Sequence, residues 1–202
     1  MSKQISSAVL RNREPILDIL SKYFIDHKRL LEVGSGAGEH ATYFCEHFPK
    51  LQWVTSDVRE NERAIVAHLR SAKMKNVHGP EILKVGVDDL PKGVFDYVFS
   101  ANTLHIMSWK EDKALFKLLG KRLREGALVI FYGPFNYAGE YTSYSNEAFD
   151  KWLKDRNEKS GIRNFEDVVS CMTKGGFKLL QDHEMPSNNR TLVFERLPYI
   201  KK

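Results

Sequence analysis

Apolar residues along most of the chain alternate between the spacing of a strand and the spacing of a helix. The apolar run 29–33 predicts a strand, the glycine-rich stretch 34–38 a turn, and the apolar spacing over 41–48 a helix that Pro49 ends. The same alternation predicts further strands over 52–55, 82–87, 96–99 and 127–132. Strands that alternate with helices form a mostly parallel sheet that is covered on both faces.

Both ends of the chain depart from this rhythm. Apolar residues at helical spacing after Pro15, which we expect in a first-turn position, predict a helix in an N-terminal extension over 1–27. The expected elements after residue 133 are helices over roughly 147–159 and 165–174 and extended runs over 177–183 and 191–195. A short connection makes the last two runs an antiparallel hairpin. The sequence therefore predicts a Rossmann-like α/β fold with a seven-stranded sheet.

Length and composition limit the class of protein but do not indicate a reaction. The chain has 202 residues, 42% of them hydrophobic and 28% charged, which suits a single folded domain over 1–202. It has no run of the roughly 18–20 apolar residues that a membrane span needs and no apolar leader, so we expect a soluble, cytoplasmic protein without a membrane partner. Cys45 and Cys171 stand outside any metal-ligand spacing, which predicts reduced thiols and no metal site.

Charge narrows the partners only slightly. The net charge of +5 permits nucleic-acid binding but does not indicate it, because Lys and Arg are interspersed with Asp and Glu. The densest basic run, 110–124, places its cations opposite a leucine stripe at helical spacing, as in the solvated face of an amphipathic helix.

The glycine-rich stretch carries the first candidate chemistry, through Gly34, Ser35, Gly36 and Gly38. Glycine allows positive φ and lets a ligand lie against the backbone, and doubly wound sheets bind ligands at the carboxyl ends of their strands. Asp57 follows Gly38 by nineteen residues and closes the second strand, where a carboxylate accepts hydrogen bonds from ribose hydroxyls. Asp88 and Asp89 offer an acceptor for an adenine amino group, with Leu90 against the ring.

Glu32 indicates which nucleoside is bound. It stands two residues before the first glycine, where a carboxylate repels a pyrophosphate but suits a ligand that carries an ammonium group. S-adenosylmethionine (AdoMet) has such a group and no phosphate, so we favour it over a dinucleotide. His40 directly follows the turn, and we expect it near the methionine moiety or at the start of the helix.

With these residues in place, the chain resembles the class I AdoMet-dependent methyltransferases, and more closely the methyltransferase-like protein 26 family. The closer resemblance covers nearly the whole chain and rests on the segments 11–17, 31–40, 101–106, 132–136, 145–150 and 185–189. It implies a class I methyltransferase sheet that binds AdoMet and releases S-adenosylhomocysteine. It implies no acceptor substrate.

Asn102 and His105 are the candidates closest to the transferred methyl group. A sulfonium methyl is already electrophilic, so a general base is optional; His105, just after the fourth strand, is the best-placed histidine, or it packs beside Ile106 and Trp109. Asn102 begins the segment Asn-Thr-Leu-His, where methyltransferases that act on planar amines carry Asn/Asp-Pro-Pro-Tyr/Phe. Without the prolines and the stacking ring, methylation of a planar amine is disfavoured.

The segment after the fifth strand is the most substrate-like part of the sequence. Its aromatic and polar residues, punctuated by glycines, predict a substrate lid inserted over 133–176, although an ordinary connection would look similar. The candidate substrate-binding residues are Arg11, Arg13, Phe135, Asn136, Tyr141 and Asn189. The two arginines would favour an anionic group on the substrate, unless they pair with Glu14 or cap a helix.

Two other functions stay open at this point. An intact cofactor turn without a recognisable catalytic set also fits a non-catalytic AdoMet-binding regulator or partner protein. An NAD-dependent oxidoreductase would need a nicotinamide site. We expect a small or medium-sized acceptor molecule as the main partner, and the sequence names no protein partner.

Overall fold

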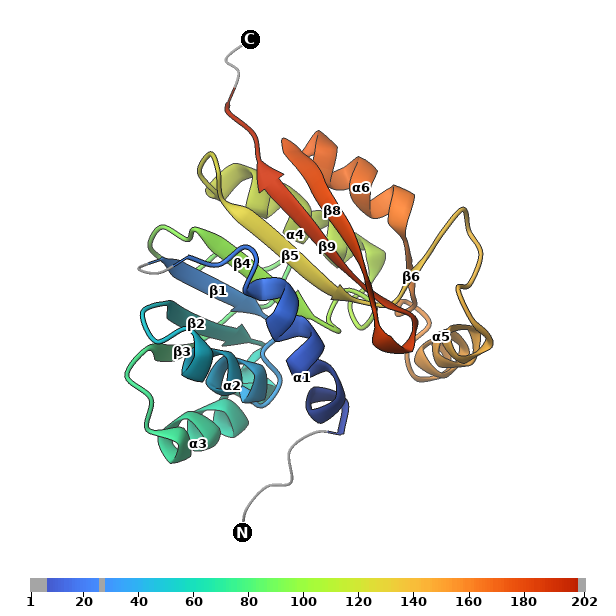
Figure 1. Ribbon diagram of the computed structural model, residues 1–202. Coiled ribbons are helices and arrows are strands. Elements are labelled where there is room, and N and C mark those ends of the chain that lie inside the picture. Colours follow the sequence, from blue (N-terminus) through green and yellow to red (C-terminus); the bar gives the residue numbers. More distant parts are fainter. Residues whose placement is uncertain (1–6, 26–27, 200–202) are drawn as a thin grey trace.

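A seven-stranded sheet forms the centre of the computed structural model, which describes residues 7–25 and 28–199 (Figure 1). Its strands are β1 (Arg29–Val33), β2 (Gln52–Asp57), β3 (Val77–Ile82), β4 (Tyr97–Ala101), β5 (Leu128–Gly133), β8 (Phe177–Met185) and β9 (Asn189–Arg196). They lie in the order β3-β2-β1-β4-β5-β9-β8. Neighbouring strands from β3 to β5 are parallel, and β9 pairs antiparallel with both β5 and β8. The predicted α/β fold with a C-terminal antiparallel hairpin is confirmed.

Helices cover both faces of this sheet (Figure 1). One face carries α1 (Ser7–Leu20), α2 (Glu39–His47) and α3 (Glu62–Ala72), and the other carries α4 (Trp109–Arg122) and α6 (Phe165–Lys174). A further helix, α5 (Tyr144–Arg156), stands beyond the carboxyl ends of the parallel strands, next to the turn of the β8–β9 hairpin. It is flanked by β6 (Phe135–Asn136) and β7 (Arg163–Asn164), which pair as a small parallel sheet.

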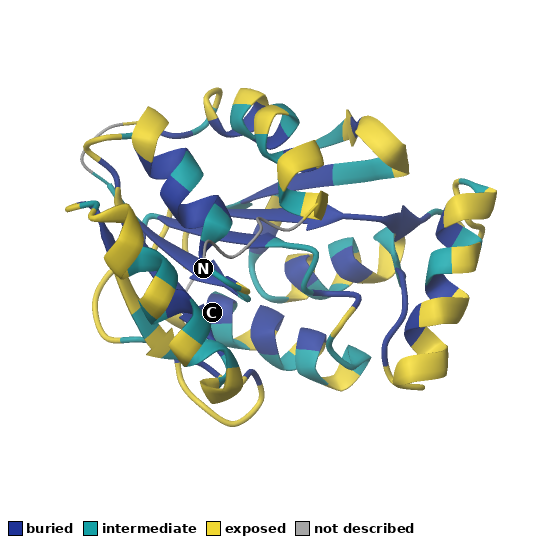
Figure 2. Ribbon diagram, turned by 90° about the horizontal axis from the view of Figure 1, so that it is seen from below, coloured by how far each residue is buried: buried dark blue, intermediate teal, exposed yellow. Residues whose placement is uncertain are grey.

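Each face of the sheet has its own hydrophobic core. Phe44 on α2 and Trp53 on β2 pack with Phe99 under the first helical layer, whereas Phe116 on α4 packs on Phe131 under the second. Figure 2 shows the buried strands between the two layers and the exposed outer side of α5. Because the central strands are buried on both faces, their sequences are continuous apolar runs rather than alternating ones.

The third strand differs from its prediction. The sequence places it over 82–87, but β3 ends at Ile82, which pairs with Asp57 at the end of β2. As the edge strand, β3 has no other neighbour, so it ends where β2 ends. Leu83 and Val85 still alternate inward like strand residues, although they belong to the following turn.

Two helices also differ from their predicted positions. Pro15 lies well inside α1 rather than in its first turn, and the described part of the 1–27 extension is helical from Ser7. The helix predicted over 147–159 begins earlier, at Tyr144, because Ser143 caps it by accepting a hydrogen bond from the Asn146 backbone N–H.

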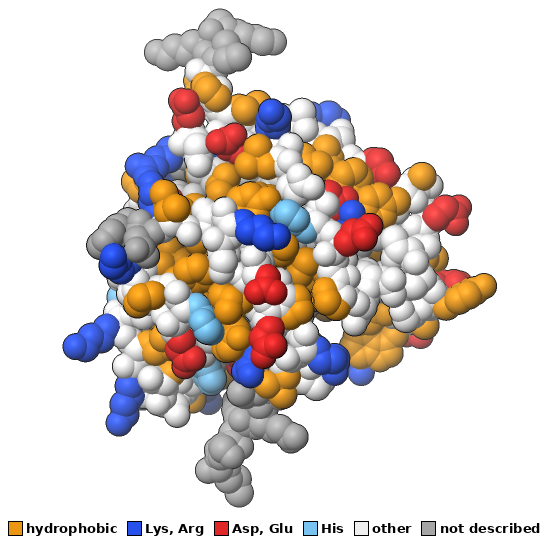
Figure 3. All heavy atoms as spheres, in the orientation of Figure 1, with side chains coloured by type: hydrophobic (Ala, Val, Ile, Leu, Met, Phe, Trp, Pro, Cys, Tyr) orange, Lys and Arg blue, Asp and Glu red, His pale blue; other side chains and the backbone are white. Residues whose placement is uncertain are grey.

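The surface agrees with the charge pattern. The cations of the 110–124 run are exposed, as predicted for a solvated helix face. Positive and negative side chains are interspersed on the face seen in Figure 3. Among the described residues, no helix has the length and apolar character that crossing a membrane requires. The described thiols Cys45 and Cys171 are free.

Candidate functional site

The glycine turn connects β1 to α2 at the carboxyl edge of the sheet. Gly34, Gly36 and Gly38 all have positive φ, at 77°, 62° and 82°. A Cβ on Gly34 would lie only 2.3 Å from Thr103 Oγ1, so the segment after β4 packs directly on the turn. A Cβ on Gly36 would meet nothing within 4 Å. The turn is therefore closed on its Gly34 side and open at Gly36, where a ligand can lie against the backbone.

Asp57 lies beside this open position. Its Oδ2 accepts a hydrogen bond of 2.7 Å from the Gly36 backbone N–H, and its Oδ1 accepts bonds from the Val58 N–H and from Asn61 Nδ2, at 2.7 and 3.0 Å. The carboxylate is only 9% exposed. Parallel pairing of β1 with β2 brings the glycine turn and Asp57 to the same edge, as the sequence predicts.

Glu32 and Ser35 support the turn from below. Glu32 is 1% exposed and its Oε2 accepts a hydrogen bond of 3.1 Å from Trp53 Nε1. Burial raises the pKa of Glu32 to about 7, so near neutral pH its charge is partly lost. Ser35 Oγ accepts a bond of 3.0 Å from the Ser56 N–H. Both side chains bond to β2, a contact that the sequence does not reveal.

His40 connects the turn to α1. Its Nε2 lies 2.8 Å from Asn12 Oδ1, and its ring stacks on Phe44. Burial lowers the pKa of His40 to about 4, which keeps the ring neutral. Asn12 also acts on the hydroxyl of Tyr132 at the end of β5, lowering its pKa against the larger effect of burial. Asn12 is not among the candidate residues predicted from the sequence. Its one signal there is its spacing, because it stands four residues before the apolar Ile16 and so shares the buried face of α1.

Arg11 and Arg13 act on different residues. Arg11 is exposed. Burial raises the pKa of the Tyr132 hydroxyl, and the positive charge of Arg11 partly offsets this rise. The Arg13 guanidinium lies over the ring of Tyr43, 4.5 Å from its centroid, and so packs on α2. The structure therefore does not bring the two arginines together at one rim.

Asp88, Asp89 and Leu90 are not gathered beside the glycine turn. Asp88 is exposed and accepts a hydrogen bond of 2.8 Å from the Lys84 N–H. Asp89 pairs with Arg122 at the C-terminal end of α4, toward the amino edge of the sheet, and Leu90 is buried in the core. The expectation of adenine contacts depended on a strand that reached residue 87, and β3 ends five residues earlier.

Asn102 and His105 meet over the end of β5. A Cβ on Gly133 would lie 3.5 Å from His105 Nδ1 and 3.8 Å from Asn102 Oδ1. Asn102 has a positive φ of 55°, and its N–H donates to the Tyr132 carbonyl at 2.8 Å. His105 is 4% exposed and lies edge-on to Phe149 of α5, with ring centroids 5.2 Å apart. Burial, helped by the nearby charge of Arg163, lowers the pKa of His105 to about 4.

The residues expected to bind substrate after β5 fall into different environments. Phe135 is part of the core under α4. Tyr141 donates to Asp150 Oδ2 at 2.7 Å, and Asn189 donates to the Pro186 carbonyl at 3.1 Å within its own turn. Asn136 is different, because it is 7% exposed and its Oδ1 has no hydrogen-bond partner among the described residues.

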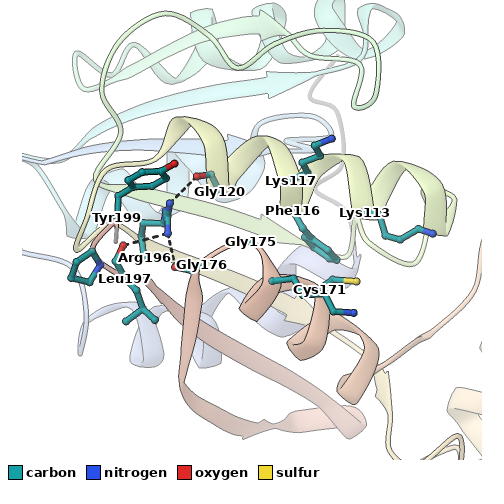
Figure 4. Close-up of a pocket in the computed structure, with 12 residues that line it drawn as sticks. Lys113, Phe116, Lys117, Gly120, Cys171, Gly175, Gly176, Arg196, Leu197 and Tyr199 are labelled. Carbon is teal, nitrogen blue, oxygen red and sulfur yellow. Dashed lines mark hydrogen bonds between the residues drawn. The ribbon is translucent and has the colours of Figure 1, made fainter. Parts of the chain in front are cut away.

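A separate cavity of about 1000 Å³ lies between α4, α6 and the segment after β9 (Figure 4). Arg196 spans it and donates to the carbonyls of Gly176 and Gly120, at 2.7 and 3.0 Å. None of the predicted site residues lines this cavity. In the part of the chain that the structure describes, no three His, Cys, Asp or Glu side chains are grouped so that they could hold a metal ion.

Several solved structures that share this fold are methyltransferases. An O-methyltransferase family protein from Burkholderia thailandensis superposes with a TM-score of 0.79 at 13% identity, over 96% of this chain and 58% of that one. An O-methyltransferase family 2 protein from Planctomyces limnophilus, in complex with apigenin, gives 0.79 at 12% identity, over 94% and 60%. Human N-acetylserotonin methyltransferase in complex with SAM gives 0.78 at 14% identity, over 94% and 53%.

This chain therefore spans little more than half the length of these methyltransferases, with which it shares the class I methyltransferase fold. Sequence comparison is more specific about its family. The family model described as "Protein of unknown function (DUF938)" matches residues 3–196, and the chain belongs to that family.

Proposed function

We propose that this protein is an AdoMet-dependent methyltransferase that acts on a small or medium-sized acceptor. The observation that carries the proposal is the open backbone at Gly36 beside the Asp57 carboxylate. This pair offers open backbone against which AdoMet can lie and an acceptor for its ribose hydroxyls. The solved neighbours support it, because all three are methyltransferases and the human enzyme was solved with SAM.

The residues present fit AdoMet better than a dinucleotide. Gly38 leads directly into α2, but the buried carboxyl of Glu32 behind the turn disfavours a pyrophosphate at this helix N-terminus. In this proposal Asp57 holds the ribose, and Gly34, Ser35 and Gly38 shape the turn. Bound AdoMet supplies an electrophilic methyl group to the acceptor.

We propose that the other predicted cofactor residues position the site rather than hold the ribose. Glu32 and His40 hold the turn and α1 through Trp53 and Asn12, and Asn102 lies at the methyl-facing edge with His105. We retain Asp88, Asp89 and Leu90 only as residues that a rearrangement of the 83–90 turn would bring to the adenine.

The acceptor side of the proposal involves the segment 133–176, which contains β6, α5, β7 and α6. We propose that 1–202 is one methyltransferase domain and that this segment covers the acceptor. The closer resemblance to the methyltransferase-like protein 26 family is part of the same proposal. One of the neighbouring structures holds apigenin, and this favours a small-molecule acceptor over a macromolecule.

Calorimetry with AdoMet, S-adenosylhomocysteine and NADH tests the proposed function. We expect binding of the first two only, with stabilisation of about 2.7 kcal/mol at a hundredfold excess over Kd. Gly36→Val should abolish binding, because its side chain fills the ligand surface. Gly126→Val is the matched control, since Gly126 also has positive φ and open space but lies before β5, at the other edge of the sheet. Binding of NADH, or of AdoMet to Gly36→Val with wild-type affinity, would contradict the proposal.

A further inference from the structure

Two polar side chains at the carboxyl edge are buried without hydrogen bonds. Asn136 is 7% exposed, and its Oδ1 has no partner among the described residues. His105 is 4% exposed as a residue, and no hydrogen bond joins its ring to another described residue, but its ring nitrogens are not among the fully buried atoms that lack a partner. Buried polar groups in native proteins are nearly always satisfied, and leaving one unpaired is unfavourable. The unpaired Asn136 Oδ1, together with a His105 ring that bonds to no described residue, points to a ligand that supplies the missing bonds.

The same short segment holds both residues in place. The Gly161 N–H donates to the His105 carbonyl at 2.9 Å, and Arg163 donates to the Met107 carbonyl. Two residues of this segment then form β7, which pairs with β6 and sets Asn136 opposite Asn164. The backbones of His105 and Asn136 are thus both tied to residues 161–164, and the His105 ring lies beside Gly133 at the end of β5.

Helix α5 covers this place from outside. Phe149 lies edge-on to His105, and Asn146 Nδ2 donates to the Asn188 carbonyl of the β8–β9 turn at 3.0 Å. Asp150, one turn further along the same face, also anchors the helix, because its carboxylate accepts from the Ile162 N–H and the Tyr141 hydroxyl, at 2.6 and 2.7 Å. Figure 1 shows α5 beyond the carboxyl ends of the strands, where it would separate an acceptor from water.

Two largely buried ionisable side chains of this region, Arg163 and Asp150, are already paired, and Arg11, whose charge acts on the Tyr132 hydroxyl, is exposed to solvent. Arg163 pairs with Asp112 at 2.6 Å, and Asp150 pairs with Lys154 at 2.6 Å. A charged acceptor would therefore be buried without a counter-ion, which is strongly unfavourable. His105 and Asn136 are both uncharged groups that can accept a hydrogen bond, and this favours a neutral molecule with hydrogen-bond donors.

We propose that His105 and Asn136 form the acceptor subsite for an uncharged compound with two neighbouring donor groups, one of them the hydroxyl that is methylated. This rests on the proposed function. In the reaction the acceptor oxygen forms a bond to the methyl carbon of AdoMet as the bond from that carbon to the sulfonium sulfur breaks. The electron pair stays on the sulfur of S-adenosylhomocysteine. The hydroxyl proton passes to an imidazole nitrogen of His105 and then to water, while Asn136 Oδ1 accepts from the second donor.

Three related probes test the class of acceptor. Catechol is neutral with two adjacent hydroxyls, o-phenylenediamine replaces both hydroxyls by amines, and 3,4-dihydroxybenzoate adds a negative charge. With radiolabelled AdoMet we expect transfer to catechol, giving its monomethyl ether, in preference to the other two. Preference for the amine or the carboxylate would overturn the proposal. So would no transfer to catechol by protein that calorimetry shows to bind AdoMet.

Two variants separate the roles of the residues. His105→Gln should lower kcat by about 10²–10⁴-fold with AdoMet affinity unchanged. Asn136→Leu should raise KM for catechol roughly 10–100-fold and leave kcat nearly unchanged. The controls are His78→Gln, an exposed histidine that bonds to Gln52, and Asn164→Leu, whose carboxamide already bonds to Asp167. Wild-type kinetics in both site variants would reduce His105 and Asn136 to packing residues. If the wild-type protein does not bind AdoMet, the proposed function itself is wrong, and the acceptor subsite that rests on it is wrong as well.

Discussion

Gly34 offers the sharpest test of how the glycine turn is built. Replacement by Ala places a Cβ 2.3 Å from Thr103 Oγ1 and 2.7 Å from its Cγ2, and both distances are too short for a non-bonded contact of a Cβ. The backbone at Gly34 also has a φ of 77°, where any Cβ costs about 1–2 kcal/mol. Overpacking adds about 1–3 kcal/mol. Together these effects predict that Gly34→Ala lowers the free energy of unfolding by about 2–5 kcal/mol.

Gly126→Ala separates the two contributions. Gly126 has a φ of 76° but open space around its Cβ position, so this variant should show only the backbone cost. Urea unfolding of the ligand-free protein measures both variants, and unchanged slopes would show that the compactness of the two states is preserved. At this chain length each kcal/mol corresponds to roughly 2–4 °C in Tm.

A second substitution tests the contact itself. Thr103→Ala removes the atoms that the new Cβ would meet, so the double variant Gly34→Ala/Thr103→Ala should be more stable than additivity predicts, by about 0.5–3 kcal/mol. Equal losses of stability in Gly34→Ala and Gly126→Ala, or strict additivity with Thr103→Ala, would show that the turn does not rest on the segment after β4.

Three further outcomes follow from the structure. Asp57→Ala should weaken AdoMet binding by about 1.5–3 kcal/mol in calorimetry, through lost hydrogen bonds to a charged group, and unchanged affinity would mean that the ribose is held elsewhere. Burial raises the pKa of Glu32 to about 7, so the native state holds this proton more tightly than the unfolded chain does. The free energy of unfolding should therefore fall as the pH rises from about 4.5 to 7, because the unfolded chain releases the proton first. Glu32→Gln should flatten that part of the stability profile measured by urea unfolding, and an identical slope in wild type and variant would contradict the burial argument. Gly120→Ala places a Cβ 2.4 Å from the Gly175 carbonyl oxygen and should lower Tm despite the better helix propensity of Ala, whereas a higher Tm would show that α4 and α6 do not touch there.

The pattern of the sequence determines the fold and the centre of the proposed cofactor site. Strand and helix periods are local properties, and the alternation between them limits the sheet to a mostly parallel one. The turn over 34–38 and Asp57 were both identifiable because positive φ requires glycine and because consecutive parallel strands end at the same edge. The pairing of β1 with β2 confirms that the two features meet.

Tertiary structure alone decides which polar groups are paired. The position of Asp89 after the third strand predicts a contact with the adenine. Its ion pair with Arg122, thirty-three residues further along the chain, holds it toward the opposite edge of the sheet instead. Tyr141 and Asn189 look like substrate contacts until the structure shows their bonds to Asp150 and Pro186. A hydrogen bond between distant segments leaves no periodic trace in the sequence, because it depends on how those segments pack.

Burial divides the remaining candidates in the same way. Phe135 and Asn136 are adjacent in the sequence and equally suited to a pocket, yet one fills the core and the other is buried without a partner. Neighbouring residues of a strand point to opposite sides, so the pairing of β6 with β7 determines which of the two side chains enters the core. The sequence supplies the chemical groups of the proposed site, and the packing of distant segments decides which of them a ligand can reach.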